Sequence, residues 1–159
     1  MEDLEEMSAP QLVAHVLARY HTVHRQQLPE LLRLARKVEQ VHGEHAACPH
    51  GLAEQLSAMA QELESHMRKE ENVLFPMIVA GRCALAAVPI RVMRMEHDDH
   101  GAALRVLEQL SNGMQPPPDA CATWRALYAG LRTFRADLLA HIDTENNLLF
   151  ERLAPAVAP

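Results

Sequence analysis

The chain has 159 residues, of which 48% are hydrophobic and 23% are charged, and its formal net charge is −6. This length suits a single domain, and this composition excludes wholesale disorder. Because the balance is acidic and no block of Lys or Arg occurs, we expect neither nucleic acid nor an anionic membrane as a partner. No apolar run approaches the roughly 18 residues of a membrane span, and the acidic first residues do not resemble a secretory signal.

Cysteine and histidine usage narrows the class further. Cys48, Cys83 and Cys121 lie far apart and form no CxxC pair, so we expect reduced structural thiols and a cytoplasmic location. The chain also contains ten histidines. Histidine is the commonest metal ligand among side chains, and this excess therefore suggests a metal site. The sequence contains no phosphate-binding glycine loop, no nucleophile elbow and no HExxH motif.

Stretches rich in Gly or Pro divide the chain into four segments at 42–51, 81–89 and 112–119. Alanine and leucine far outnumber the β-branched residues, which favours helix over strand. Each segment carries a stripe of residues with steps of three and four, so we predict four amphipathic helices. Short links between them predict an all-α, antiparallel up-down-up-down four-helix bundle, with the domain at 10–154 and tails at 1–9 and 155–159.

The stripes indicate which side of each helix faces the core. Pro29 lies inside the first helix, and we expect it to kink or split that helix. Asp119 follows three prolines and is the expected N-cap of the fourth helix. The four stripes are Ala14, Leu17, His21, His24, Leu28, Leu31, Ala35, Val38 and His42; Leu52, Leu56, Met59, Leu63, His66, Glu70, Val73 and Met77; Ile90, Met93, His97, His100, Leu104 and Leu107; and Trp124, Leu127, Leu131, Phe134, Leu138, His141, Glu145 and Leu148.

Nine of these stripe positions are polar where leucine would be expected. A single histidine there is explained by a hydrogen bond inside the core. An ionised glutamate is different, because burying it without a partner costs several kcal/mol. Glu70 and Glu145 each follow a histidine, His66 and His141, by four residues, and this spacing lets both side chains reach one point.

The two HisxxxGlu segments also resemble one another. Residues 66–75 align without gaps with residues 141–150 and share the His, the first Glu, an Asn and a Leu-Phe pair. Another histidine stands 45 positions before the first segment, at His21, and 44 positions before the second, at His97. The chain is therefore expected to form two helix pairs around one site with four His and two Glu.

A comparison of heights supports this site. In an antiparallel pair, residues at one level lie equally far from the turn. The midpoints between successive ligand groups fall at about residues 44, 82 and 120, inside or at the end of the three breaks. All six side chains can therefore lie at one level of the bundle.

The ligand types indicate the metal. Imidazole and carboxylate without thiolate favour iron or manganese over structural zinc. Two Glu shared among four His suit a dinuclear centre, in which each metal holds two His and both Glu bridge. Open positions then remain for a bridging oxygen or a diatomic gas. The ferritin-like pattern of paired ExxH motifs does not fit, because the only ExxH runs from Glu39 to His42.

These residues resemble the hemerythrin-like, or HHE cation-binding, domain, and more closely its repair of iron centres family. The resemblance runs from about Tyr20 to Leu153 and implies a hemerythrin-like bundle with the ligands His21, His66, Glu70, His97, His141 and Glu145. It also implies two non-haem iron ions, oxo-bridged, and a link to nitric oxide, oxidative stress and damaged iron–sulfur clusters. The motifs that carry it are Arg19-Tyr-His-x-x-His-Arg-x-Gln-Leu-Pro29, Lys37-Val-Glu-x-Val-His42, His66-Met-x-Lys-Glu-Glu-x-x-Leu-Phe-Pro76, Met95-Glu-His-Asp98 and His141-x3-Glu-Asn-Asn-x-Leu-Phe150.

Two departures from the family pattern affect the expected function. Oxygen-carrying hemerythrins have a HisxxxHis on the third helix, whereas here Gly101 follows His97 by four residues, which argues against a simple oxygen carrier. Full-length repair proteins carry an N-terminal domain with a vicinal cysteine pair, and these 159 residues contain no such pair. Repair that depends on those thiols is therefore not expected, and sensing or binding of NO gains weight.

We expect a di-iron protein that responds to nitric oxide and oxidative stress, binds NO or O2 species and supplies iron for the repair of damaged iron–sulfur proteins. The alternative is a hemerythrin-like O2- or NO-binding or sensing module without repair activity. Among the other histidines, His24 and His100 are expected either to donate hydrogen bonds to ligands or to be packing residues. His42 is expected to have a structural or access role.

Overall fold

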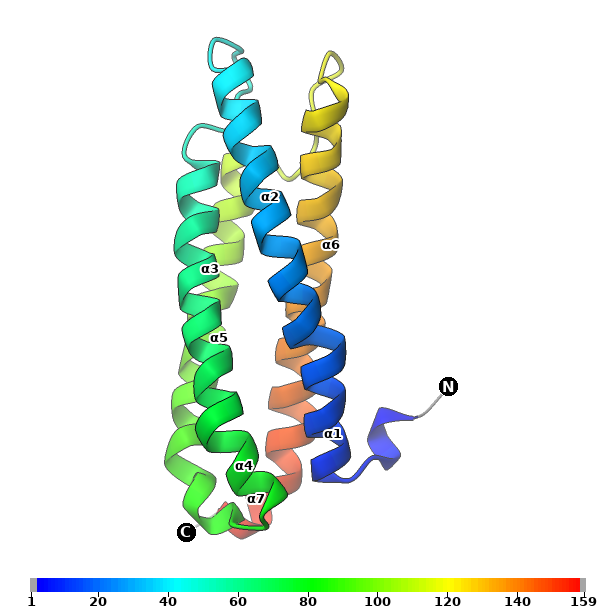
Figure 1. Ribbon diagram of the computed structural model, residues 1–159, viewed down its shortest axis with the longest axis vertical. Coiled ribbons are helices and arrows are strands. Elements are labelled where there is room, and N and C mark those ends of the chain that lie inside the picture. The colour runs from blue at the N-terminus through cyan, green and yellow to red at the C-terminus, as the bar shows by residue number, and fades with distance from the viewer. Residues whose placement is uncertain (1–2, 158–159) are drawn as a thin grey trace.

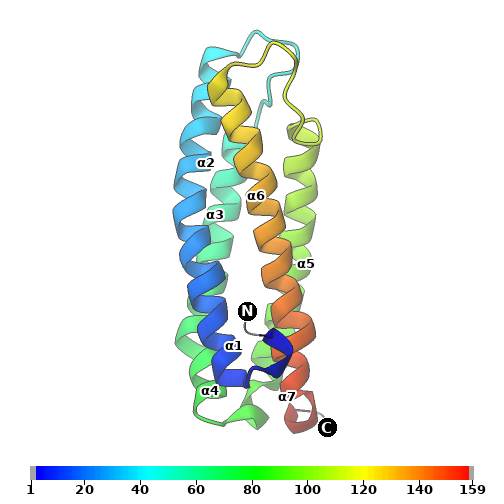
Figure 2. The ribbon, with the colours of Figure 1, turned by 90° about the vertical axis from the view of Figure 1, so that its right-hand side faces the viewer.

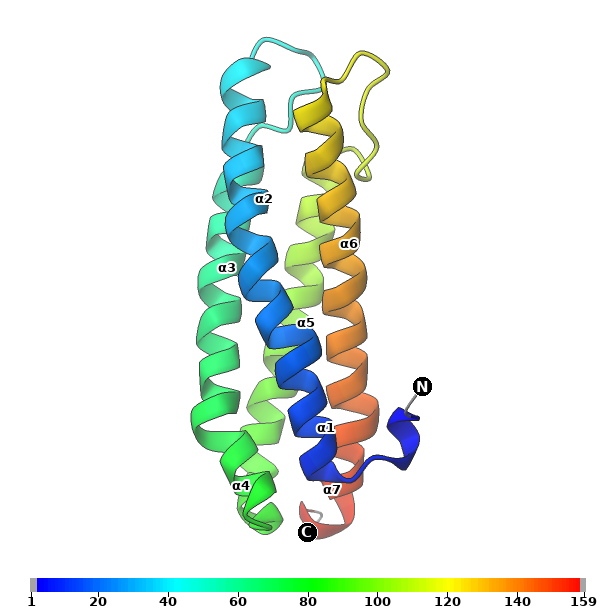
Figure 3. The same ribbon diagram turned by 45° about the vertical axis from the view of Figure 1, so that its right-hand side comes forward.

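The computed structural model describes residues 3–157, with side chains up to Leu153, and these residues form helices joined by short loops (Figure 1). Four antiparallel rods run side by side, and each of the long helices α2, α3, α5 and α6 contacts two neighbours, in the cyclic order α2, α3, α5, α6 (Figures 2 and 3). This confirms the predicted all-α four-helix bundle. The helices are α1 (Ala9–Val16), α2 (Thr22–Val41), α3 (Leu52–Lys69), α4 (Phe75–Val79), α5 (Ala87–Leu110), α6 (Ala122–Thr144) and α7 (Phe150–Val157), with short 3₁₀ turns η1 (Leu4–Glu6) and η4 (Cys83–Ala86).

Three of the four rods contain a π-helical segment, and each segment touches a predicted ligand. His21 ends η2 (Leu17–His21), Glu70 begins η3 (Glu70–Leu74), and Glu145 begins η5 (Glu145–Leu149). π-helical turns are rare and occur frequently at functional sites. The fourth rod, α5, is α-helical throughout.

The π segments correct parts of three predicted stripes. A π turn holds an extra residue, so the buried face beyond it moves by one position. After Glu70 the buried residues of this rod are Leu74, Phe75 and Ile78, whereas Val73 is 46% exposed and Met77 is only half-buried.

The same displacement occurs in the first and fourth rods. Beyond Glu145 the chain buries Leu149 in place of Leu148. Before His21, Ala14 is exposed and Leu17 is half-buried, and the buried residues there include Val16. The stripe on α5, which has no π segment, is buried at all six predicted positions.

The split of the first helix at Pro29 is contradicted, the kink there stays a prediction, and the predicted N-cap at Asp119 is wrong. The first rod is not split at Pro29, because α2 continues through it from Thr22 to Val41, and the irregularity of this rod is the π segment before α2. The N-cap of α6 is Cys121. Asp119 instead accepts a hydrogen bond from His45 Nε2 at 2.9 Å, which ties the two loops at this end of the bundle together. The domain boundaries at 10–154 stay a prediction, and residues 1–2 and 158–159 lie outside the described residues.

Two apolar clusters lie on either side of the layer that holds the predicted ligands. One cluster includes Leu56, Leu63, Trp124 and Phe134 and fills the half of the bundle next to the 42–51 and 111–121 loops. The other includes Leu12, Phe75, Ile90 and Phe150 and fills the half that contains the chain ends. Within the described residues, no helix is long and apolar enough to cross a membrane.

Candidate metal centre

The six predicted ligands converge between the two apolar clusters, and all of them are buried. Their nitrogen and oxygen atoms form two groups of four, and within each group the atoms lie within 4.8 Å of one another. Both carboxylates belong to both groups, as the proposed sharing of two Glu among four His requires. The groups are His21, His141, Glu70 and Glu145, and His66, His97, Glu70 and Glu145.

Each carboxylate contacts histidines of both groups. Glu70 Oε1 lies 3.1 Å from His21 Nε2 and 3.3 Å from His66 Nε2. Glu145 uses different oxygens, with Oε1 at 2.9 Å from His97 Nε2 and Oε2 at 3.0 Å from His141 Nε2. All four imidazoles therefore present Nε2 to the centre, and the two carboxylates lie between the two histidine pairs.

The donor set fits a pair of metal ions. Four buried atoms of the centre have no aligned hydrogen-bond partner among the described residues: His66 Nε2, His97 Nε2, Glu70 Oε2 and Glu145 Oε1. Buried polar atoms are normally satisfied, and two buried carboxylates need positive charge nearby. Cations between the imidazoles and carboxylates would meet both needs. A set of nitrogen and oxygen donors without thiolate suits iron or manganese.

The second ring nitrogen of every ligand histidine is bound by an outer partner, defined here as the residue that contacts its Nδ1. Such a partner fixes the ring orientation and the tautomer and leaves Nε2 for a metal. For three of the four, this partner is an oxygen acceptor, so Nδ1 must carry the proton. The four contacts are His21 with Glu71 at 2.6 Å, His66 with Glu96 at 2.9 Å, His97 with Asn146 at 2.8 Å and His141 with His24 Nε2 at 3.0 Å.

Sequence reasoning missed three of these partners, although each is adjacent in sequence to a predicted ligand. Glu71 follows Glu70, Glu96 precedes His97, and Asn146 follows Glu145. Adjacent residues on a helix point in different directions, so none of the three lies on a ligand stripe. All three are polar residues directly next to a predicted ligand in sequence. The side chain of each reaches a histidine of the neighbouring rod.

The two carboxylate partners are themselves paired with cations at the surface. Arg25 binds Glu71 and Glu64 through its guanidinium, and Lys69 binds Glu96. Burial opposes ionisation of Glu71, but hydrogen bonds from Arg25 and His21 outweigh it and hold the pKa of Glu71 below its ordinary value. The same balance, with Lys69 as the donor, lowers the pKa of Glu96.

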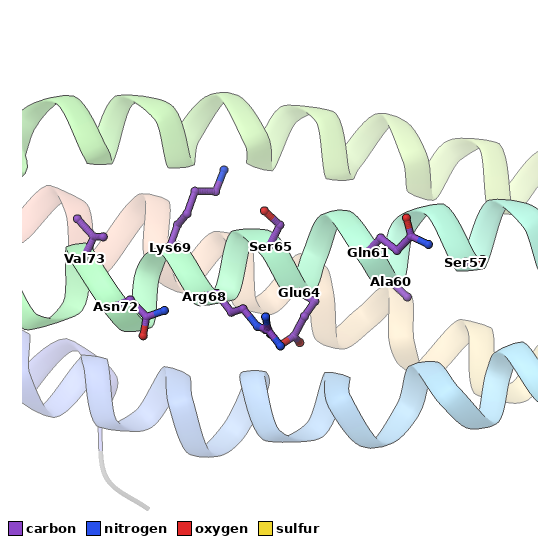
Figure 4. A pocket seen from close by; sticks show the side chains of 9 residues that line it. All are labelled: Ser57, Ala60, Gln61, Glu64, Ser65, Arg68, Lys69, Asn72 and Val73. Carbon is purple, nitrogen blue, oxygen red and sulfur yellow. The ribbon is translucent and has the colours of Figure 1, made fainter.

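Two of the paired residues, Glu64 and Lys69, line a surface pocket along α3. Figure 4 shows Arg68 lying against Glu64, to which it donates a hydrogen bond at 3.0 Å. It also shows Lys69 pointing toward α5, which carries Glu96. None of the six predicted ligands lines this pocket.

The ligand histidines differ in their protonation properties. Burial, together with the neighbouring His141, lowers the pKa of His21 to about 4. Burial also disfavours the charged form of His66, but the carboxylates of Glu145 and Glu70 outweigh it and raise the pKa to about 10. In the absence of metal, the imidazole of His21 is therefore neutral at pH 7, whereas that of His66 carries a proton on both nitrogens and a positive charge.

The two carboxylates differ as well. Burial, reinforced by the charge of Glu145, raises the pKa of Glu70 well above its ordinary value. Burial acts on Glu145 too, but His141, His66 and His97 outweigh it and lower its pKa well below the ordinary value. Two carboxylates at one buried centre cannot both ionise without compensating cations. The raised pKa of Glu70 favours its protonated form, which cations bound at the centre would oppose.

Three further histidines singled out from the sequence lie in two different places. His24 and His100 are buried beside the centre, His24 in contact with His141 and His100 with its Nδ1 unpartnered among the described residues. His42 lies beside Trp124, and its Nε2 is 3.2 Å from Cys121 Sγ. Neither metal-capable group includes it.

A buried layer of imidazole and carboxylate inside an antiparallel four-helix bundle defines a metal-binding, hemerythrin-like helical protein. Residues 12–153 match the hemerythrin HHE cation binding domain, and the chain belongs to this family. Membership implies iron binding, for which the two His/Glu groups are available.

Curated relatives show which members of the hemerythrin family this chain resembles. The iron-sulfur cluster repair protein YtfE of Pectobacterium atrosepticum is 53% identical over 150 residues, which are 94% of this chain and 68% of the relative. Proteins of the same name from Yersinia pseudotuberculosis and Musicola paradisiaca are 52% identical over 151 residues and 54% identical over 141 residues. The former match spans 95% of this chain and 68% of the relative, the latter 89% and 64%. The resemblance to the repair of iron centres family is thereby confirmed.

Proposed function

We propose that the centre holds two iron ions. His21 and His141 bind one ion, His66 and His97 bind the other, and Glu70 and Glu145 bridge them, with an oxo bridge completing the pair. The observation that carries this proposal is that both carboxylates belong to both four-residue groups. A single metal would coordinate only one of the two histidine pairs.

The protein binds NO or O2 species at this centre under nitric oxide and oxidative stress, and supplies iron to damaged iron–sulfur proteins. The name shared by the relatives, iron-sulfur cluster repair protein, supports this function over a module that only binds or senses gas. Identity of 53% over 94% of the chain makes transfer of that function reasonable. The cytoplasmic location stays a prediction.

When bound, two ferrous ions supply electrons and coordination positions that the six side chains do not fill. The chain's own residues prepare this site. Each imidazole directs Nε2 at the centre because its Nδ1 contacts an outer partner, and metal binding would require Nε2 without a proton. The apolar clusters above and below the layer keep bulk water away, and α5 offers Gly101 where a second imidazole would fill a further position.

Metal analysis and optical spectroscopy of the purified protein test the centre. We expect about two irons per chain and charge-transfer bands of an oxo-bridged pair. One zinc per chain, or a protein that takes up no iron when ferrous ion is added without oxygen, would contradict the proposal.

Reactivation of an NO-damaged [4Fe–4S] enzyme tests the repair function. The iron-loaded protein should restore activity faster than the same quantity of free ferrous ion, and should lose iron as it does so. Stable, reversible O2 binding without iron transfer would instead support the gas-binding module.

A further inference from the structure

One ligand histidine differs from the other three in its outer partner. His21 and His66 contact carboxylates and His97 contacts an amide oxygen, all of which accept only. His141 contacts another imidazole, that of His24. A neutral imidazole can donate or accept at either nitrogen, so this contact alone does not determine which nitrogen of His141 carries the proton.

The contact continues outward as a chain of hydrogen bonds. His24 Nδ1 lies 3.2 Å from Gln27 Oε1, and Gln27 Nε2 donates to Asp137 Oδ2 at 2.7 Å. Arg19 Nη2 donates to the other oxygen, Asp137 Oδ1, at 2.8 Å. His24 and Gln27 belong to α2 and Asp137 and His141 to α6, so the chain joins these two helices from the centre to the surface.

The carboxylate at the end of the chain determines its direction. Asp137 only accepts, so the nitrogen of Gln27 must face it and the oxygen of Gln27 must face His24. His24 then carries its proton on Nδ1 and presents a bare Nε2. That bare nitrogen accepts from His141 Nδ1, which leaves His141 Nε2 directed at the centre, 3.0 Å from Glu145 Oε2.

Packing explains why His24 is buried but not how its nitrogens are arranged. Its ring lies against Tyr20 and Phe134, with centroids 6.3 and 5.6 Å away, and a leucine would satisfy such contacts. The repeat supplies a comparison, because His100 follows His97 by three residues as His24 follows His21. His100 is equally buried, but it forms no hydrogen bond to a ligand, since Glu96 occupies Nδ1 of His66.

We propose that His24 is a positioning residue for His141 and that Asp137, acting through Gln27 and His24, fixes the tautomer of His141 as a metal ligand. The metal-binding consequence rests on the proposed di-iron function. The hydrogen-bond direction does not, because it is set by residues outside the ligand set.

Asp137→Asn tests the direction without changing the shape. Arg19 holds the oxygen of the new amide on its own side, so the NH2 group faces Gln27 and forces the Gln27 oxygen toward it. Every hydrogen bond between Asp137 and His141 then runs in the opposite direction. His24 carries its proton on Nε2 and donates it to His141 Nδ1. Ferrous iron affinity, measured by competition with a chelator, should fall roughly 10- to 100-fold, the usual cost of losing an outer partner.

Four further variants separate the effect of hydrogen-bond direction from the effects of charge and packing. Arg19→Met combined with Asp137→Asn frees the amide to turn its oxygen toward Gln27, and should recover most of the affinity. Asp143→Asn removes the same charge from an exposed position of α6 and should stay within about twofold of the parent. His24→Leu should weaken iron binding, whereas His100→Leu should not.

Nitrogen NMR of the metal-free protein provides a readout that does not require iron. The imidazole of His24 should carry its proton on Nδ1 in the parent chain and on Nε2 in Asp137→Asn. Unchanged tautomers in that variant, or iron affinity within twofold of a parent that binds two irons, would overturn the inference while leaving the di-iron function intact. If the parent binds no iron, the proposed function fails, and the tautomer of His24 alone decides the inference.

Discussion

The two helix pairs of this protein supply equivalent ligands but different surroundings. The first pair contributes His21, His66 and Glu70, and the second contributes His97, His141 and Glu145, with a π segment beginning at each glutamate. The residue after that glutamate supports the first histidine of the same pair in both halves. It is a carboxylate, Glu71, in one half and an amide, Asn146, in the other.

This difference shows which parts of the repeat the centre requires. The proposed pair of ions would need six donors at one level, and those positions are the same in both halves. The outer partners only have to hold Nδ1 of each ring, and several chemical groups can do so. The electrostatic result is uneven: burial and the charge of Glu145 raise the pKa of Glu70, whereas the histidines around Glu145 outweigh burial and lower its pKa.

Replacing either bridging carboxylate should have the largest effect and should remove the difference between the halves. Glu70→Gln and Glu145→Gln keep the shape but remove an anion from both metals, so we expect iron per chain to fall from about two to well below one. The helical circular dichroism should be largely retained, because the apolar stripes supply most of the burial.

A charge control and a stability measurement complete this experiment. Glu62→Gln removes a charge from the exposed face of α3 and should leave iron content unchanged. If the glutamates were only buried, strained carboxylates, the neutral amides would raise the melting temperature and leave iron content unaffected. Unchanged iron in both variants would reject the bridging assignment.

The convergence of the six predicted ligands could be predicted from the sequence because their positions follow from helix geometry alone. The i, i+4 spacing of His66 and Glu70 and the equal distances from the turns require only the pitch and rise of an α-helix. The stripe on α5 was predictable for the same reason. The buried face beyond Glu70 was not, because the π turn at η3 adds a residue that no local pattern marks.

The outer partners lie beyond sequence reasoning for a different reason. Whether Glu96 reaches His66 depends on the relative rotation and height of α5 and α3, which are set by packing of the whole bundle. The pairing of His24 with His141 depends in the same way on α2 and α6. Equivalent positions in the repeat therefore do not guarantee equivalent contacts, as His100 demonstrates.

Proton release should distinguish the two carboxylates. In the metal-free protein the pKa of Glu70 is raised well above its ordinary value and that of His66 is raised to about 10. Metal ligands bind in their deprotonated forms, so binding of ferrous iron should displace protons from these two groups. Affinity should therefore fall about tenfold per pH unit for each displaced proton as pH decreases, with iron lost below about pH 6.

A titration at constant pH measures this release directly. We expect about two protons per pair of irons added to the parent chain in weak buffer. Because Glu70→Gln holds no proton at that position, any iron it still binds should release about one proton fewer. Release of no protons by the parent would show that His66 and Glu70 are already deprotonated before iron binds.

Exchanging the outer partners of the two halves should have a moderate effect. Glu71→Gln replaces the carboxylate beside His21 with an amide. The imidazole then becomes less basic and donates electrons to the metal less strongly, so we expect roughly tenfold weaker iron binding. Asn146→Asp gives His97 a carboxylate partner and should lower the reduction potential of the centre by tens of millivolts, because added negative charge stabilises ferric iron. Potentiometric titration of both variants measures the effect, and equal potentials would show that the outer partners only orient the rings.

The smallest expected effect concerns His100, the position in the second pair equivalent to His24. Its buried Nδ1 has no partner among the described residues, and burial lowers its pKa to about 3, with the charges of His66 and His97 contributing. Leucine fills a similar volume without an unsatisfied polar atom, so His100→Leu should raise the free energy of unfolding of the metal-free protein by about 1 kcal/mol at pH 7.5. Between pH 6.5 and 3 the unfolded chain protonates this histidine and the folded chain does not, so the parent loses stability as pH falls. The stability gained by His100→Leu should therefore increase below pH 6.5 in urea titrations.

His24→Leu breaks a hydrogen bond to His141 and should instead lower the free energy of unfolding at pH 7.5. Equal changes in the two variants would mean that these histidines are equivalent packing residues after all.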